Sequence, residues 1–144
     1  MKNHQVASFG SFAQLEQHLF QHPKREGIKA RGKVFMKNAL GLTGLEVSLN
    51  KFKPGVAVPF LHKHEKHEEV YLCLAGKGEM VIDGERVSLE QGTAVRVAPE
   101  GARAIRNSSG EDFVYLCIQA TVNTMCEQET VTDGRPAEGA PWGA

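Results

Sequence analysis

The sequence has few cysteines and no net charge. Its 144 residues include three cysteines, Cys73, Cys117 and Cys126, and no CxxC pair. An odd, irregularly spaced set is unsuited to a disulfide framework and fits a reducing compartment. The 17 basic and 17 acidic residues cancel. This balance argues against a nucleic-acid partner, because proteins in that role usually carry a basic excess.

Long apolar runs are also missing. No run approaches the roughly 20 residues that a membrane-spanning helix needs, and residues 1–10 lack the apolar core of a secretory signal. We therefore expect a cytoplasmic protein with no membrane partner. The length is typical of one domain.

Helical periodicity is confined to the N-terminal part. Ser11 can cap a helix, and Gln14 falls at the third helical position, as in a capping box. The apolar residues that recur at helical spacing are Phe12, Leu15, Leu19 and Phe20. The helix should end before Pro23, because a residue that precedes proline is pushed out of helical geometry.

The remainder of the chain has the pattern of short β-strands. Apolar and polar residues alternate or form short apolar runs, and Asp83-Gly84 is a strong hairpin signal. The runs cover residues 45–49, 70–74, 80–82, 86–89, 93–98 and 113–118. Because no helices separate them, the sequence predicts an all-β sandwich or barrel rather than a parallel α/β sheet.

One histidine-rich segment is the candidate site. His62 and His64 are two residues apart, so in an extended chain both side chains point to the same side and Lys63 points away. Two convergent imidazoles provide half of a first-row transition-metal site, and a carboxylate from Glu68 or Glu69 would complete a three-ligand face. The competing interpretation is a charged surface loop, since the same window is rich in Glu and Lys.

The segment resembles the first motif of the cupin superfamily. That motif consists of a glycine, a spacer, His-x-His, a glutamate and a second glycine, which correspond here to Gly55, His62, His64, Glu69 and Gly76. The spacer after the first glycine is one residue longer than usual. Glu69 is preferred over its neighbour because it lies at the six-residue spacing from the second glycine. The resemblance implies a cupin-type double-stranded β-helix (jelly-roll) barrel with a short N-terminal helix.

A second cupin motif is present in a degraded form. Pro99, Gly101 and Asn107 match its pattern, but Arg103 occupies the position where the family usually has a histidine. In familiar cupin enzymes that histidine is a fourth metal ligand. Arg103 cannot replace it, because a guanidinium stays protonated and has no lone pair to offer.

Three arrangements therefore remain open. The protein can hold a metal ion through His62, His64 and Glu69 with water, as in facial non-haem iron sites. It can recruit another ligand, with His67 the nearest candidate. It can also lack a metal, with the carboxylate paired to Arg103 in a satisfied buried pair.

The resemblance and the residues together lead to one functional expectation. We expect a divalent transition metal (Fe, Mn, Ni, Cu or Zn) and a small polar or anionic metabolite, with Arg103, Tyr71 and Gln119 as substrate-binding residues. A dioxygenase, decarboxylase or isomerase would fit, and the alternative is a non-catalytic binding or sensing module; a third hypothesis is a barrel that serves assembly. No nucleic-acid partner is expected, whereas a homodimer is. We divide the single domain into a helical extension (1–30), the barrel (31–120) and a tail (121–144).

Overall fold

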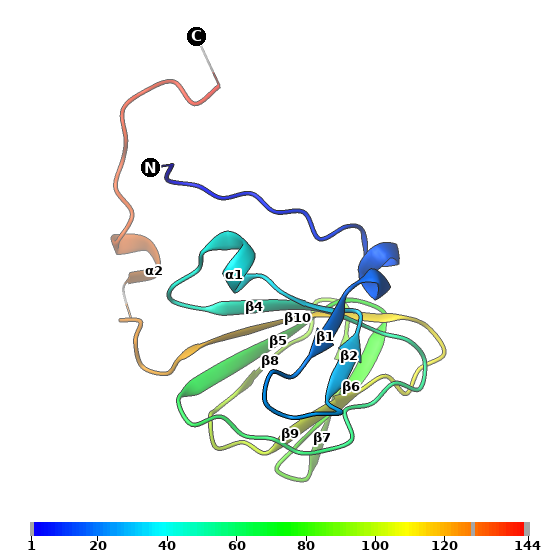
Figure 1. The fold of residues 1–144 in the computed structure, drawn as a ribbon. Coiled ribbons are helices and arrows are strands. Elements are labelled where there is room, and N and C mark those ends of the chain that lie inside the picture. The colour runs from blue at the N-terminus through cyan, green and yellow to red at the C-terminus, as the bar shows by residue number, and fades with distance from the viewer. Residues whose placement is uncertain (1, 128, 143–144) are drawn as a thin grey trace.

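The computed structural model describes residues 2–127 and 129–142, and within them the chain forms three antiparallel sheets (Figure 1). The five-stranded sheet has the order β3 (Lys33–Phe35), β4 (Glu46–Phe52), β10 (Phe113–Thr121), β5 (His67–Ala75) and β8 (Ala94–Val97). The three-stranded sheet has the order β7 (Glu85–Glu90), β6 (Lys77–Ile82) and β9 (Arg103–Arg106). A small hairpin joins β1 (Leu19–Gln21) to β2 (Lys29–Arg31).

The main core lies between the two larger sheets. Met80, Leu89 and Ile105 of the three-stranded sheet belong to one buried cluster with aromatic residues of the five-stranded sheet. The rings of Phe113 and Tyr115 on β10 are stacked, with centroids 5.0 Å apart. The prediction of an all-β fold is therefore confirmed.

Strands β5 and β10 form the middle of the five-stranded sheet and carry the site. Their register pairs Glu69 with Gln119 and Tyr71 with Cys117. On β5, Glu69, Tyr71 and Cys73 are all buried, as expected when side chains two residues apart share a face. The charged Glu69 thus lies on the same buried face of β5 as Tyr71 and Cys73.

The N-terminal helix is shorter than predicted. The structure has a 3₁₀-helix, η1 (Phe12–Gln17), and Oε1 of Gln14 accepts a hydrogen bond from the Ser11 amide, as the capping pattern indicated. The predicted continuation through Leu19 and Phe20 is wrong, because these residues belong to β1. Phe20 packs edge-on against Phe35, with ring centroids 5.2 Å apart, so pairing with β2 and contact with β3 override the helical pattern.

Two further helical turns are present, α1 (Lys37–Leu40) and α2 (Glu129–Thr132). The second follows β10, where the chain extends away from the sheets (Figure 1). Among the described residues, no helix has the length and apolar character required to cross a bilayer.

Two glycines of the first motif offer a matched test of backbone constraint. Gly55 and Gly76 both have positive φ, +84° and +73°. A Cβ at Gly76 would lie 1.9 Å from the carbonyl oxygen of Asp112, whereas a Cβ at Gly55 would meet nothing within 4 Å. We expect Gly55→Ala to lower the free energy of unfolding by about 1 kcal/mol, from left-handed strain alone. Gly76→Ala should cost about 3 kcal/mol or more. Urea unfolding measures both, and equal losses would contradict the role of the close approach.

Candidate metal centre

A cavity of about 640 Å³ is bordered by the five-stranded sheet. Its lining combines residues of the β1–β2 hairpin, β3, β4, β5 and β10 with the loop over residues 56–64. Most of the lining is apolar. One group of polar residues in the lining consists of His62, His64 and Glu69.

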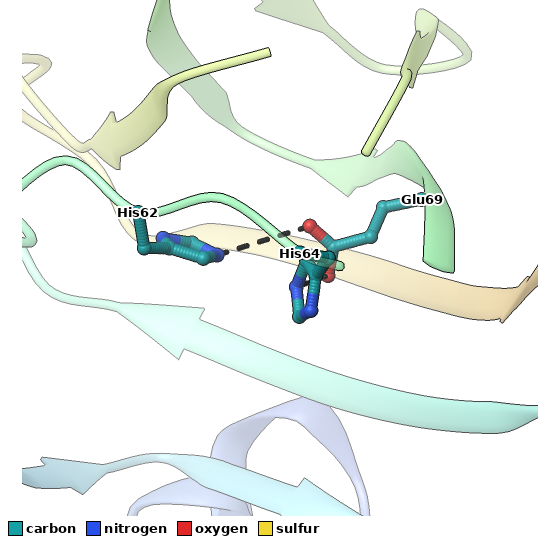
Figure 2. A group of neighbouring side chains, drawn as sticks. All are labelled: His62, His64 and Glu69. Carbon is teal, nitrogen blue, oxygen red and sulfur yellow. Dashed lines mark ion pairs between the residues drawn. The ribbon is translucent and has the colours of Figure 1, made fainter. Parts of the chain in front are cut away.

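The three side chains predicted as ligands lie together (Figure 2). Nε2 of His64 is 3.3 Å from Oε2 of Glu69, and Nε2 of His62 is 3.9 Å from Oε1 of the same carboxylate. The two imidazole rings are nearly perpendicular, at 84°. One potential ligand atom of each residue falls within 4.8 Å of the other two.

The loop before β5 is held in the extended form that this arrangement needs. His62 and Arg103 exchange two backbone hydrogen bonds, both 3.1 Å, and the amide of His64 donates to the carbonyl of Pro99 at 3.1 Å. Lys63 points outward and pairs with Glu100 at 3.3 Å. The prediction that Lys63 faces away from the histidines is therefore confirmed.

Glu69 is 3% exposed and its carboxylate is oriented by three neighbours. The Tyr71 hydroxyl donates to Oε1 at 2.8 Å, the Cys117 thiol donates to Oε2 at 3.2 Å, and Nε of Arg103 lies 3.0 Å from Oε1. Burial acts to raise the pKa of Glu69. The hydrogen bonds from Cys117 and Tyr71 and the charges of His64 and Arg103 outweigh it and hold that pKa below its ordinary value. Glu69 is therefore an anion.

Arg103 points inward, as the motif alignment predicted, but does not line the cavity. Its side chain is completely buried behind the carboxylate, and Nη1 donates to the carbonyl of Gly101 at 2.7 Å. The Glu69–Arg103 pair considered from the sequence is thus present. It coexists with the convergence of His62 and His64 on the same carboxylate.

The donor set suits a first-row divalent ion. Within residues 2–127 and 129–142, the buried side-chain nitrogens that make no hydrogen bond of good geometry are Nδ1 of His62, Nε2 of His64, and Nε and Nη2 of Arg103. Two of them, Nε2 of His64 and Nε of Arg103, lie within ion-pair distance of Glu69. Ligand bonds of about 2.1 Å place neighbouring donor atoms about 3 Å apart, close to the 3.3 Å between His64 and Glu69. Burial, the largest cause, lowers the pKa of both histidines, which favours the neutral form that binds metals.

The remaining predicted residues have distinct positions. Glu68, the alternative carboxylate, pairs with Arg96 at 2.7 Å, away from the two histidines. Nδ1 of His67 lies 2.8 Å from Oε1 of Gln119, so His67 is engaged outside the three-residue cluster. Tyr71 and Gln119 both line the cavity.

Sequence reasoning missed Lys33, which also lines the cavity. Its Nζ donates to Oδ1 of Asn50 at 2.8 Å. Nothing in the three-residue run Lys33–Phe35 distinguishes an inward lysine from a solvated one. Reasoning also assigned no role to Cys117 beyond packing, although its thiol contacts Glu69.

The sequence model of the family described as "Cupin domain" matches residues 48–119, half of the chain. This chain belongs to the cupin family. A crystal structure of a cupin protein from Bacteroides fragilis is 36% identical, with a TM-score of 0.78 over 96% of this chain and 100% of that chain. The structural similarity to that protein therefore extends over nearly the whole molecule, whereas the family's sequence model matches half of it.

Relatives with a stated activity match less of this cupin. A glucose-6-phosphate isomerase from Thermococcus gammatolerans is 39% identical over 64 residues, 40% of this chain and 34% of that protein. A predicted oxalate decarboxylase from Thermotoga maritima is 28% identical, with a TM-score of 0.50 over 53% of this chain and 65% of that chain. This cupin covers less than half the length of the curated relatives it matches.

Two arginines of β9 test the dependence of Glu69 on its buried partner. Arg103→Met leaves a buried carboxylate without its cation, and we expect the free energy of unfolding to fall by about 3–5 kcal/mol. Arg106 is 44% exposed and pairs with Glu79 at 2.6 Å, so Arg106→Met should cost about 1 kcal/mol or less. Chemical unfolding of the metal-free variants gives both values. Similar losses for the two would show that burial of Arg103 carries no special role.

The lowered pKa values of His62 and His64 predict a pH effect on stability. Near pH 7 both histidines are neutral in the folded and unfolded chain. As pH falls through the ordinary value of 6.5, the unfolded chain takes up protons that the folded protein resists. Metal-free wild type should therefore lose stability relative to His62→Ala/His64→Ala between about pH 7 and about pH 5. Urea titrations across this range measure the difference, and a constant difference would refute the expectation.

Proposed function

We propose that this cupin binds a divalent transition-metal ion through His62, His64 and Glu69 and presents it to a small polar or anionic metabolite. The observation that supports this most is the position of Nε2 of His64, which makes no hydrogen bond of good geometry and lies 3.3 Å from Oε2 of an anionic Glu69 beside a cavity. When bound, such an ion supplies Lewis-acid chemistry or a site for oxygen. Three protein ligands leave coordination positions for water or a metabolite.

The neighbours of Glu69 fix which part of the carboxylate faces the histidines. Tyr71 and Arg103 occupy Oε1, so Oε2 is the oxygen nearer His64. Cys117 contacts Oε2 through a weak thiol donor. One carboxylate can therefore neutralise Arg103 and still act as a ligand. The arginine in place of the family's usual fourth ligand is thus compatible with the proposed site.

Dioxygenase, decarboxylase and isomerase reactions are the classes we propose for turnover. The printed names of the relatives include an isomerase and a predicted decarboxylase, which supports the range without selecting a member. A non-catalytic binding module is the second candidate. It is favoured by the pKa values of Tyr71 and Cys117, which burial raises, because neither group is then prepared to act as a base or nucleophile.

Metal content is the direct test. Wild type purified without a histidine tag should contain close to one equivalent of Fe, Mn, Ni, Cu or Zn by elemental analysis, and His62→Ala/His64→Ala should lose it, because two of three ligands are gone. His67→Ala is the matched control. It removes a neighbouring histidine that binds Gln119 instead, and should retain the metal. Equal metal content in wild type and the double variant would overturn the proposal.

A further inference from the structure

A second polar cluster lies in the cavity, on β3 and β4. Nζ of Lys33 is 2.8 Å from Oδ1 of Asn50 and 3.5 Å from Oγ of Ser48, and it lies 4.7 Å from the centroid of the Phe35 ring. Lys33 precedes the stretch that matches the cupin family. The cluster therefore joins a lysine that precedes the matched stretch to two polar residues within it, Ser48 and Asn50.

Basic residues outnumber acidic ones around the cavity. Among the described residues that line it, Glu69 is the acidic one, and it pairs with Arg103. The basic ones are Arg25, Lys29, Arg31, Lys33 and Lys63. Arg25, Lys29 and Arg31 are exposed and Lys63 points outward, so Lys33 is the partly buried cation among them. Among the described residues, no carboxylate lies within ion-pair distance of Lys33, whereas Lys63 has Glu100. The hydrogen bonds of Lys33 thus go to neutral side chains, and no carboxylate of the described residues contacts its Nζ directly.

Burial also lowers the pKa of Lys33, since desolvation is the largest cause of its shift. Charge interactions with Glu69 and Glu46 oppose this lowering only in part, and the hydrogen bonds of Lys33 go to neutral partners, Asn50 and Ser48. An anion placed next to the ammonium would restore part of the lost stabilisation.

We propose that Lys33 binds the carboxylate of a small organic acid whose apolar body packs in the cavity. An ammonium has three N–H donors, and contacts with Asn50 and Ser48 use up to two of them. One donor suits a carboxylate oxygen, whereas a phosphate is usually held by several donors, such as amides of a helix N-terminus or an Arg fork. Phe20, Phe35 and Phe52 line the same cavity and suit an apolar body better than the hydroxyl groups of a sugar.

The position of Lys33 also limits the size of the ligand. Its Nζ contacts side chains of β4, and Glu69 lies on β5, with β10 between these strands. Two strand intervals of about 4.8 Å separate β4 from β5 by roughly 10 Å. An acid with a ring or a short chain can reach from Lys33 toward the triad. The orientation of the acid toward His62, His64 and Glu69 rests on the proposed function, whereas its contact with Lys33 does not require a metal.

Calorimetric titration of metal-free protein tests the contact. Benzoate and hexanoate are the carboxylate probes, benzamide is the neutral counterpart of benzoate, and inorganic phosphate is the competing anion. Wild type should bind a carboxylate probe, and Lys33→Met should bind it at least about tenfold more weakly. Lys33→Arg should retain more of the binding. Lys77→Met, at an exposed lysine of β6, should match wild type.

Four results would overturn the proposal. Two concern carboxylates: K33M binds a carboxylate as tightly as wild type, or wild type binds neither carboxylate. The other two are benzamide binding as tight as benzoate binding, and Lys33-dependent phosphate binding that is tighter than binding of either carboxylate. Circular dichroism and thermal unfolding check that K33M is folded, and K33R provides the comparison if K33M is not.

The same titration in His62→Ala/His64→Ala separates this proposal from the metal site. Retained benzoate binding there supports the Lys33 contact, whatever the metal content. Metal bound by wild type without Lys33-dependent carboxylate binding would refute the Lys33 contact and leave the metal proposal intact.

Discussion

The site depends on one buried ion pair, between Glu69 and Arg103. Each residue is almost or completely inaccessible to solvent, and each would be costly to bury alone. Their pairing allows a strand to carry a carboxylate into the core beside Tyr71 and Cys73. The same arginine exchanges backbone hydrogen bonds with His62, so the residue in place of the usual histidine positions both the carboxylate and a predicted ligand.

The sequence predicted the barrel and the cluster of predicted ligands because both depend on local spacing. Alternation placed Glu69 inside, and the His-x-His spacing placed His62 and His64 on one side of an extended loop. The alignment with Gly76 selected Glu69 over its neighbour, and the geometry agrees. The expected homodimer and cytoplasmic location stay predictions.

What the sequence could not predict depends on contacts between distant segments. Leu19 and Phe20 have helical spacing, but β2 and Phe35 draw them into a hairpin. Lys33 faces the cavity because β3 pairs with β4, a pairing that its short sequence does not indicate. The alignment correctly placed Arg103 inside, but only the structure reveals that its guanidinium is used by Glu69 and by carbonyl oxygens of the loop before β9.

The sequence analysis considered two roles for Arg103, pairing with Glu69 and binding an anionic ligand, and the structure separates them. A cation that orients Glu69 is already neutralised, so it has little charge to offer a ligand. Lys33 hydrogen-bonds to neutral partners and, within the described part of the chain, forms no ion pair that a ligand would have to displace. Arg103 therefore belongs to the support of the candidate metal centre, and the anion-binding role passes to the N-terminal part of the chain. In the proposed arrangement, a lysine that precedes the cupin match contributes to ligand selection at a site whose His62, His64 and Glu69 lie within that match.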